Sequence, residues 1–202
     1  MPEFAILLDP QARNGRGRAI LFRDAGDIEA DHVNFMATTA KGLIAVALPY
    51  ARACALDLPP MRGGAARPGR PITLANIEAR CCEGTGISAA ERALTLRTLA
   101  AWGASPADFV TPGHVIVTVV MDRVLPEGET VPLSEMALPI AARQSGALGI
   151  AWADMLGQSG DLAGTAEVEA LASKFGIKVY RSDAAPATSP MADNDDRLVR
   201  VG

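Results

Sequence analysis

The sequence is poor in the side chains that most often bind metals or carry redox chemistry. It contains two His and three Cys among 202 residues. Cys54, Cys81 and Cys82 do not have the spacing of zinc ligands, and two adjacent thiols have a poor geometry for an ordinary disulfide. We therefore expect three reduced thiols in packed positions, no metal site and no cofactor. No catalytic triad has proper spacing either.

Long hydrophobic runs and an excess of positive charge are also missing. No apolar run reaches the roughly 18 residues that a membrane helix needs. The start "MPEFAILLDP" lacks the basic residues and cleavage site of a signal peptide, so we expect a cytoplasmic protein without a membrane partner. A net charge of −4 argues against nucleic acid as a partner. Hydrophobic and charged residues make up 49 % and 21 % of the chain, as in ordinary folded domains.

The length of the chain suits one substantial α/β domain or at most two small ones, and we assume a single domain over residues 1–181. A Pro, Gly and Arg-rich loop is expected at 59–71, and a disordered tail at 182–202. Pro139 is expected to interrupt the helix in which it lies. Strands are expected at 4–8, 19–22, 43–49, 72–82, 111–121, 147–156 and 177–181, and helices at 27–42, 84–103, 132–146 and 165–176.

The segment "DPQARNGRGRAILFRDAGD" places four arginines, Arg13, Arg16, Arg18 and Arg23, in and beside a turn between two apolar strands. One interpretation is a solvated turn, which is the usual place for a run of charges. The other is an anion site, in which Gly15 and Gly17 let the backbone approach a ligand and guanidiniums bind its carboxylate or phosphate. The residues alone leave both interpretations open.

A second candidate site is the stretch "GTGISA", which fits a short dinucleotide-binding pattern. The acid expected about 20 residues later would be Asp108, but this residue lies in a turn-like context. Ser88 and Glu91 instead have the spacing of a capping box at a helix start. Thr85 and Ser88 could hold a phosphate there, or simply cap the helix. His114 opens a strand after a Pro-Gly turn, where it could act as a general acid or base or have a structural role.

Four collinear blocks, "VNFMATTAKGLIAVAL", "LDLPPM", "GTGISAAERALTL" and "PADFVTPGHVI", resemble the 3,4-dihydroxy-2-butanone 4-phosphate synthase family over about residues 4–181. This riboflavin-pathway enzyme converts ribulose 5-phosphate to a four-carbon product and formate. The resemblance implies a single-domain α/β sandwich with a mixed sheet, and a homodimer whose active sites lie near the subunit interface.

Several positions depart from the family pattern. The family has an acidic, magnesium-binding turn at the position of residues 13–18. Arg13 and Gly17 match the Arg and the Gly of that turn, and its three acids are replaced by Asn14, Arg16 and Arg18. Leu133 stands at the position of the second metal ligand, a His, and is followed by Ser134 for Thr and by a retained Glu135.

The other departures concern single residues. A family cysteine is replaced by Ala45, the Arg before Pro-Gly-His by Thr111, and a late catalytic Glu by Asp154. His114, a catalytic position in the family, is retained. Without the acids and the His we expect no magnesium site, because Mg²⁺ requires oxygen ligands and Arg provides none.

We therefore expect a metal-independent lyase or isomerase that acts on a small phosphorylated or carboxylated substrate. Its expected catalytic residues are His114, Asp154 and Glu135. The expected substrate-binding residues are Arg13, Asn14, Arg16, Arg18, Thr85, Ser88 and Ser134. Two alternatives stay open, namely a non-catalytic homodimeric binding or regulatory relative and a genuine 3,4-dihydroxy-2-butanone 4-phosphate synthase.

Overall fold

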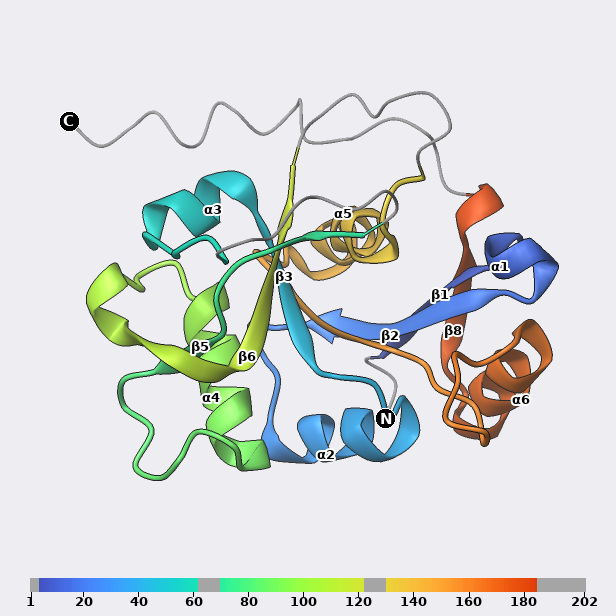
Figure 1. The fold of residues 1–202 in the computed structure, drawn as a ribbon, viewed down its shortest axis with the longest axis horizontal. Coiled ribbons are helices and arrows are strands. Elements are labelled where there is room, and N and C mark those ends of the chain that lie inside the picture. Colours follow the sequence, from blue (N-terminus) through green and yellow to red (C-terminus); the bar gives the residue numbers. More distant parts are fainter. Residues whose placement is uncertain (1–3, 62–69, 122–129, 185–202) are drawn as a thin grey trace.

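The computed structural model describes residues 4–61, 70–121 and 130–184 (Figure 1). Most of the expected loop at 59–71 and most of the expected tail at 182–202 lie outside these residues. The described start of the tail, Ser182–Ala184, forms a single 3₁₀ turn, η2. Within the described ranges no helix is both long and apolar enough to cross a membrane.

The fold is a mixed eight-stranded sheet with helices on both faces, as expected for an α/β sandwich. Its strand order is β4-β6-β3-β7-β2-β1-β8, and β5 pairs with β6 outside this path. The strands are β1 Ala5–Asp9, β2 Arg18–Asp24, β3 Ala45–Pro49, β4 Ile72–Thr73, β5 Ile77–Ala79, β6 Phe109–Val120, β7 Ile150–Asp154 and β8 Lys178–Arg181. The helices are α1 Ala12–Gly15, α2 Ala30–Thr39, α3 Tyr50–Ala55, α4 Ala89–Ala100, η1 Pro106–Asp108, α5 Leu133–Ser145 and α6 Thr165–Phe175.

Successive side chains of a strand point to opposite faces of the sheet, and the central strands are buried on both faces. One face packs against α2, α4 and α6 through residues such as Val33, Leu96 and Val168. The other packs against α5 through residues such as Leu133 and Ala137. Figure 1 shows α2 and α4 below the sheet and α5 above it. The α5 face carries the side chains on which the candidate site is built.

The arginines around the first turn separate onto two faces of β2. Arg18 shares the α5 face with Ile20 and Phe22, which belong to the core cluster on that face. Arg23, five residues further along, points to the opposite face. It is only 3 % exposed, and it forms an ion pair with Asp27 at 2.7 Å and lies over the ring of Phe4. Arg23 therefore belongs to the structure of the other face and not to the candidate site.

Two expectations about packing were wrong. Helix α5 runs through Pro139 without interruption, because Leu138, Ile140 and Ala141 around it pack against the sheet and offset the lost backbone hydrogen bond. The cysteines are free thiols as expected, but Cys54 and Cys81 are exposed and Cys82 is half-buried. Burial raises the pKa of the Cys82 thiol, which makes it a poorer nucleophile.

Candidate functional site

A cavity of about 530 Å³ opens on the α5 face of the sheet, and we call it the sheet-face pocket. Its volume lies within the usual range for small-molecule sites. Its floor comes from four neighbouring strands, since β6, β3, β7 and β2 are adjacent in the sheet. It is lined by Arg18, Lys41, Gly42, Leu43, Ala45, Arg70, Pro71, Thr73, Ile116, Thr118, Trp152, Asp154, Leu156 and Leu162.

Arg18 and Asp154 form a forked ion pair in this pocket. Arg18 Nε lies 2.9 Å from Asp154 Oδ1. Arg18 Nη2 lies 2.8 Å from the same oxygen and 3.2 Å from Oδ2. Ile20 pairs with Asp154 across β2 and β7, so Arg18 reaches the carboxylate diagonally along the same sheet face. No hydrogen bond among the described residues uses Arg18 Nη1, which leaves that end of the guanidinium for a ligand.

Trp152 forms the floor next to the ion pair. Its backbone pairs with Ala45 of β3. The indole Nε1 donates to Thr118 Oγ1 at 3.1 Å, and that hydroxyl donates to the carbonyl oxygen of Val46 at 2.8 Å. The indole N–H and the threonine hydroxyl are therefore satisfied within the fold. The pocket floor is a fixed, largely apolar surface.

Lys41 lies at the edge of the sheet-face pocket in a conformation that L-residues adopt rarely. Its φ is 64°, and it follows directly on the last turn of α2, where its N–H donates to Met36 O. Glycine is the usual residue at this helix-end position. A lysine there costs about 1 kcal/mol of backbone strain. Strain beside a cavity suggests that the charge has a function.

We expect Lys41→Gly to raise the free energy of unfolding by about 1 kcal/mol, because glycine adopts a positive φ without steric cost. Urea denaturation followed by circular dichroism measures this change. The same variant should bind anions more weakly than the wild type. An unchanged or lower stability would contradict the strain at this position.

Among the arginines of the first turn, Arg18 is the one that lines the pocket. Arg13 donates to the carbonyl oxygen of Leu162 at 2.7 Å and to Asp161 Oδ2 at 2.8 Å, so it ties the turn to the loop before α6. Asn14 and Arg16 are exposed and outside the lining. The expected clamp of three arginines is thus not assembled around the cavity. Substrate binding by Arg13, Asn14 and Arg16 stays a prediction.

The residues of the "GTGISA" stretch lie at the start of α4. Ser88 Oγ accepts the N–H of Glu91 at 3.2 Å and donates to Glu91 Oε2 at 2.9 Å. Glu91 also accepts the N–H of Gly84. The hydrogen bonds from the Ser88 hydroxyl and the Gly84 N–H lower the pKa of Glu91. The helix-start cap is confirmed. Thr85 is exposed beside it, and an anion-binding role of Thr85 and Ser88 stays a prediction.

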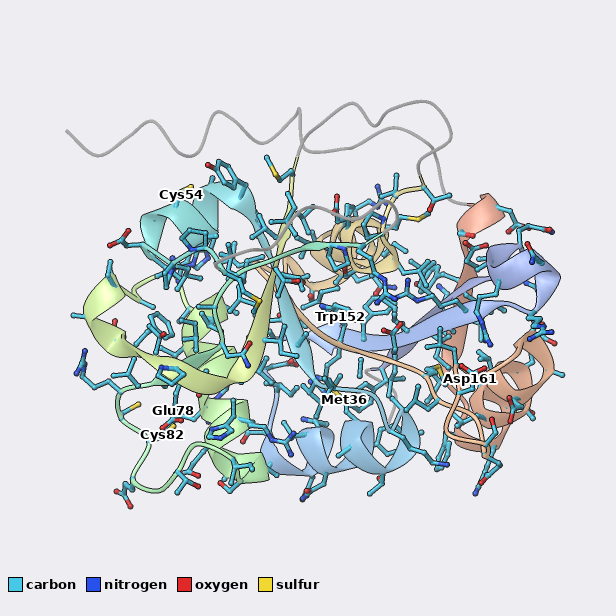
Figure 2. All side chains as sticks on the ribbon, viewed as in Figure 1. Met36, Cys54, Glu78, Cys82, Trp152 and Asp161 are labelled. Carbon is cyan, nitrogen blue, oxygen red and sulfur yellow. The ribbon has the colours of Figure 1, made fainter. Side chains whose placement is uncertain are left out.

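His114 lies in the same region, next to Glu78 of β5. Its Nδ1 is 3.4 Å from Glu78 Oε2. Gly86 has a φ of +73°, and a Cβ there would lie 1.9 Å from the same carboxylate oxygen. The glycine of the pattern therefore makes room for Glu78, which lies beside His114. In Figure 2, Glu78 is well separated from Trp152, so within one chain His114 is not part of the sheet-face pocket.

Ser134 and Glu135 lie in the first turn of α5. Both are buried, at 2 % and 7 % exposure, and neither belongs to the pocket lining. The Ser134 Oγ has no hydrogen-bond partner among the described residues. Their expected roles in substrate binding and proton transfer stay predictions.

Arg18 and Asp154 are the lining residues that were expected from the sequence as site residues, and those not expected include Lys41, Arg70 and Trp152. The dipeptide Lys41-Gly42 could have indicated a helix end, but not that the lysine reaches a cavity. Arg70 and Trp152 come from segments far apart in the sequence, and only the fold brings them together. A local pattern carries no signal for such a contact.

The sequence pattern of the 3,4-dihydroxy-2-butanone 4-phosphate synthase family matches residues 2–184. The synthase of Pseudomonas aeruginosa is 31 % identical over 181 residues, which are 88 % of this chain and 47 % of that protein. The synthase of Agrobacterium fabrum is 35 % identical over 126 residues, 62 % of this chain and 56 % of that protein. The chain thus spans about half the length of these curated relatives.

Solved structures of the same enzyme superpose on the fold. A two-domain synthase from A. baumannii has a TM-score of 0.76 at 31 % identity, over 88 % of this chain and 51 % of that one. A synthase solved in complex with two magnesium ions has a TM-score of 0.72 at 28 % identity, over 89 % and 87 % of the two chains.

The residues of the sheet-face pocket do not fit a magnesium ion. Mg²⁺ prefers near-octahedral oxygen ligands, often from carboxylates. Here the one carboxylate in the lining, Asp154, is paired with the Arg18 guanidinium, and Lys41 and Arg70 add further positive charge. Among the described residues no group of three or more His, Cys, Asp or Glu side chains is arranged to hold a metal.

The agreement in sequence extends over residues 2–184, and the agreement in fold covers 88 % of the chain. The turn between β1 and β2 and the pocket beside it therefore lie in the part of the chain that the family pattern matches. The chain belongs to the 3,4-dihydroxy-2-butanone 4-phosphate synthase family.

Proposed function

We propose that the chain is a diverged lyase or isomerase that binds a small phosphorylated or carboxylated substrate in the sheet-face pocket without a metal ion. The observation that carries this proposal is the charge of the lining, in which Arg18, Lys41 and Arg70 outnumber the single carboxylate of Asp154. Asp154 is paired with Arg18, and Lys41 also interacts electrostatically with Glu167, so the three cations still exceed the nearby carboxylates and can attract an anion.

Arg18 has a geometry suited to a developing negative charge. Asp154 fixes the guanidinium through Nε and Nη2, and Nη1 is left to donate to a substrate oxygen. A donor that is already oriented stabilises an enolate or carboxylate oxygen without reorganisation during the reaction. Asp154 acts in this scheme as the group that positions Arg18, in addition to its expected role in proton transfer.

Proton transfer by His114 requires a second copy of the chain. Within one copy His114 lies beside Glu78, apart from the pocket. We infer a homodimer in which the helix-start region of one subunit approaches the pocket of the other. Both regions expose a large apolar side chain, Leu43 at the pocket and Ile87 at the helix start, with exposures of 78 % and 60 %. The proposed homodimer would cover both side chains.

The parent reaction is the second candidate, and it is supported by the name of the relatives at 31 % identity. Under the proposed function we expect no formate from ribulose 5-phosphate, with or without Mg²⁺, at enzyme concentrations at which a relative gives rapid turnover. A coupled formate dehydrogenase assay measures this. Formate release that requires Mg²⁺ would establish the parent activity and contradict the proposal.

The third candidate, a non-catalytic relative, differs in the role of His114. A binding protein should keep every cellular phenotype in the His114→Ala variant. An enzyme should lose its phenotype in that variant while the melting temperature is retained. His32→Ala is a control, since His32 Nδ1 accepts the Glu29 N–H in the first turn of α2 and lies outside the pocket.

A further inference from the structure

The sheet-face pocket has few side-chain acceptors for the hydroxyl groups of a ligand. Arg18, Lys41 and Arg70 donate hydrogen bonds and accept none. The Thr118 hydroxyl already donates to Val46 O and accepts from Trp152. Among the lining side chains, the remaining acceptors are the free lone pairs of Asp154, whose oxygens already face Arg18, the second lone pair of the buried Thr118 hydroxyl, and the hydroxyl of Thr73.

Most of the remaining lining is hydrocarbon. Leu43, Ala45, Ile116 and Leu162 contribute aliphatic side chains, and Trp152 contributes an indole whose polar N–H is already bonded within the fold. A ligand hydroxyl placed against this surface would lose its hydrogen bonds to water without replacement, at a cost of about 1–3 kcal/mol for each group. A hydrocarbon surface in the same place gains about 25 cal/mol for each Å² that is buried.

We propose that the pocket selects an anion on an apolar, hydroxyl-free body, and disfavours a polyhydroxylated sugar phosphate. The inference rests on the proposed anion-binding function and narrows it to a ligand class. The cations at the rim bind the carboxylate or phosphate, and the hydrocarbon body lies over Trp152 and Ile116. The anionic group can be a carboxylate or a phosphate monoester, and the experiment separates the two.

The test is a calorimetric titration of the full chain with four probes. 4-Methyl-2-oxopentanoate is a carboxylate and phenyl phosphate is a phosphate monoester, and both have an apolar organic group. Ribulose 5-phosphate has a polyhydroxylated group, and inorganic phosphate has no organic group. We expect at least one apolar anion to bind about tenfold more tightly than ribulose 5-phosphate and inorganic phosphate, because that ratio corresponds to burying a few tens of Å² of hydrocarbon. Tighter binding of ribulose 5-phosphate than of both apolar anions would overturn the inference and leave the anion site intact.

Two variants divide the contributions of charge and hydrocarbon. Lys41→Asn removes the cation, and asparagine tolerates a positive φ, so the variant should bind every anion more weakly than the wild type does. Ile116→Thr keeps a β-branched side chain and adds a hydrogen-bond acceptor. The variant should therefore bind the apolar anions more weakly and ribulose 5-phosphate more tightly than the wild type does. Val179→Thr, on β8 outside the lining, is the matched control, because Val179 is half-buried and β-branched like Ile116. Equal affinities in the Ile116 and Val179 variants would overturn the inference, and no binding of any anion to the wild type would overturn the proposed function as well.

Discussion

Gly42→Ala is expected to destabilise the fold by about 3 kcal/mol or more, the range reached when a close backbone contact is overfilled. A Cβ at Gly42 would lie 2.2 Å from the carbonyl oxygen of Asp154 and 3.0 Å from its backbone nitrogen and carbonyl carbon. These are backbone atoms, so no side-chain rotation relieves the clash. The chain before β3 and the end of β7 must then separate, and Asp154 moves away from Arg18.

Thermal and urea unfolding measure the effect of Gly42→Ala. Gly103→Ala is the matched control, because a Cβ at Gly103 meets no atom within 4 Å. The control should unfold as the wild type does, whereas Gly42→Ala should unfold at much lower urea or fail to accumulate as folded protein. Equal stabilities of the two variants would show that the backbones of residues 42 and 154 are not in close contact.

Arg18→Met is expected to lower the free energy of unfolding by about 2 kcal/mol, less than for a fully buried pair because both side chains retain some exposure. The side chains of Arg18 and Asp154 are 18 % and 25 % exposed. Removing the guanidinium leaves a half-buried carboxylate without its partner. Anion binding should fall as well, since the pocket loses one of its cations and gains an uncompensated negative charge.

A double-mutant cycle isolates the ion pair from other effects of Arg18→Met. Asp154→Leu alone should also destabilise the protein, because it leaves the cation unpaired. The variant with both changes should be nearly as stable as the wild type, since an apolar pair can replace a poorly solvated ion pair. Strictly additive effects of the two changes would mean that Arg18 and Asp154 do not interact in solution.

The alternation of side chains in β2 explains part of what the sequence could reveal. Arg18 and Arg23 are an odd number of residues apart in one strand, so they must point to opposite faces. The alternation of side chains along one strand is therefore enough to predict that these two guanidiniums lie on opposite faces of the sheet. The two charges were nevertheless grouped in one cluster in the predictions. The buried strand at β3 and the cap at Ser88 were predicted, because each depends on a local pattern of hydrophobic spacing or capping.

The candidate site was less predictable, since its contacts join distant segments. Nothing near Arg13 in the sequence indicates that its guanidinium bonds to Leu162 and Asp161. The resemblance to the family aligned Asp154 with a catalytic acid, but the pairing with Arg18 depends on β2 and β7 being neighbours. Lys41 and Arg70 have no motif, and they join the site only because the fold brings them to the same cavity.

The most direct test of the account is thermal unfolding of the wild type and of Lys41→Asn with small anions in EDTA and with ribulose 5-phosphate plus Mg²⁺. Ligands that bind the folded state raise the melting temperature. The account predicts stabilisation of the wild type by an anion in EDTA, and loss of that stabilisation in Lys41→Asn but not in the exposed control Lys174→Asn. Stabilisation only by ribulose 5-phosphate together with Mg²⁺, equal in all three proteins, would contradict a metal-independent cationic pocket.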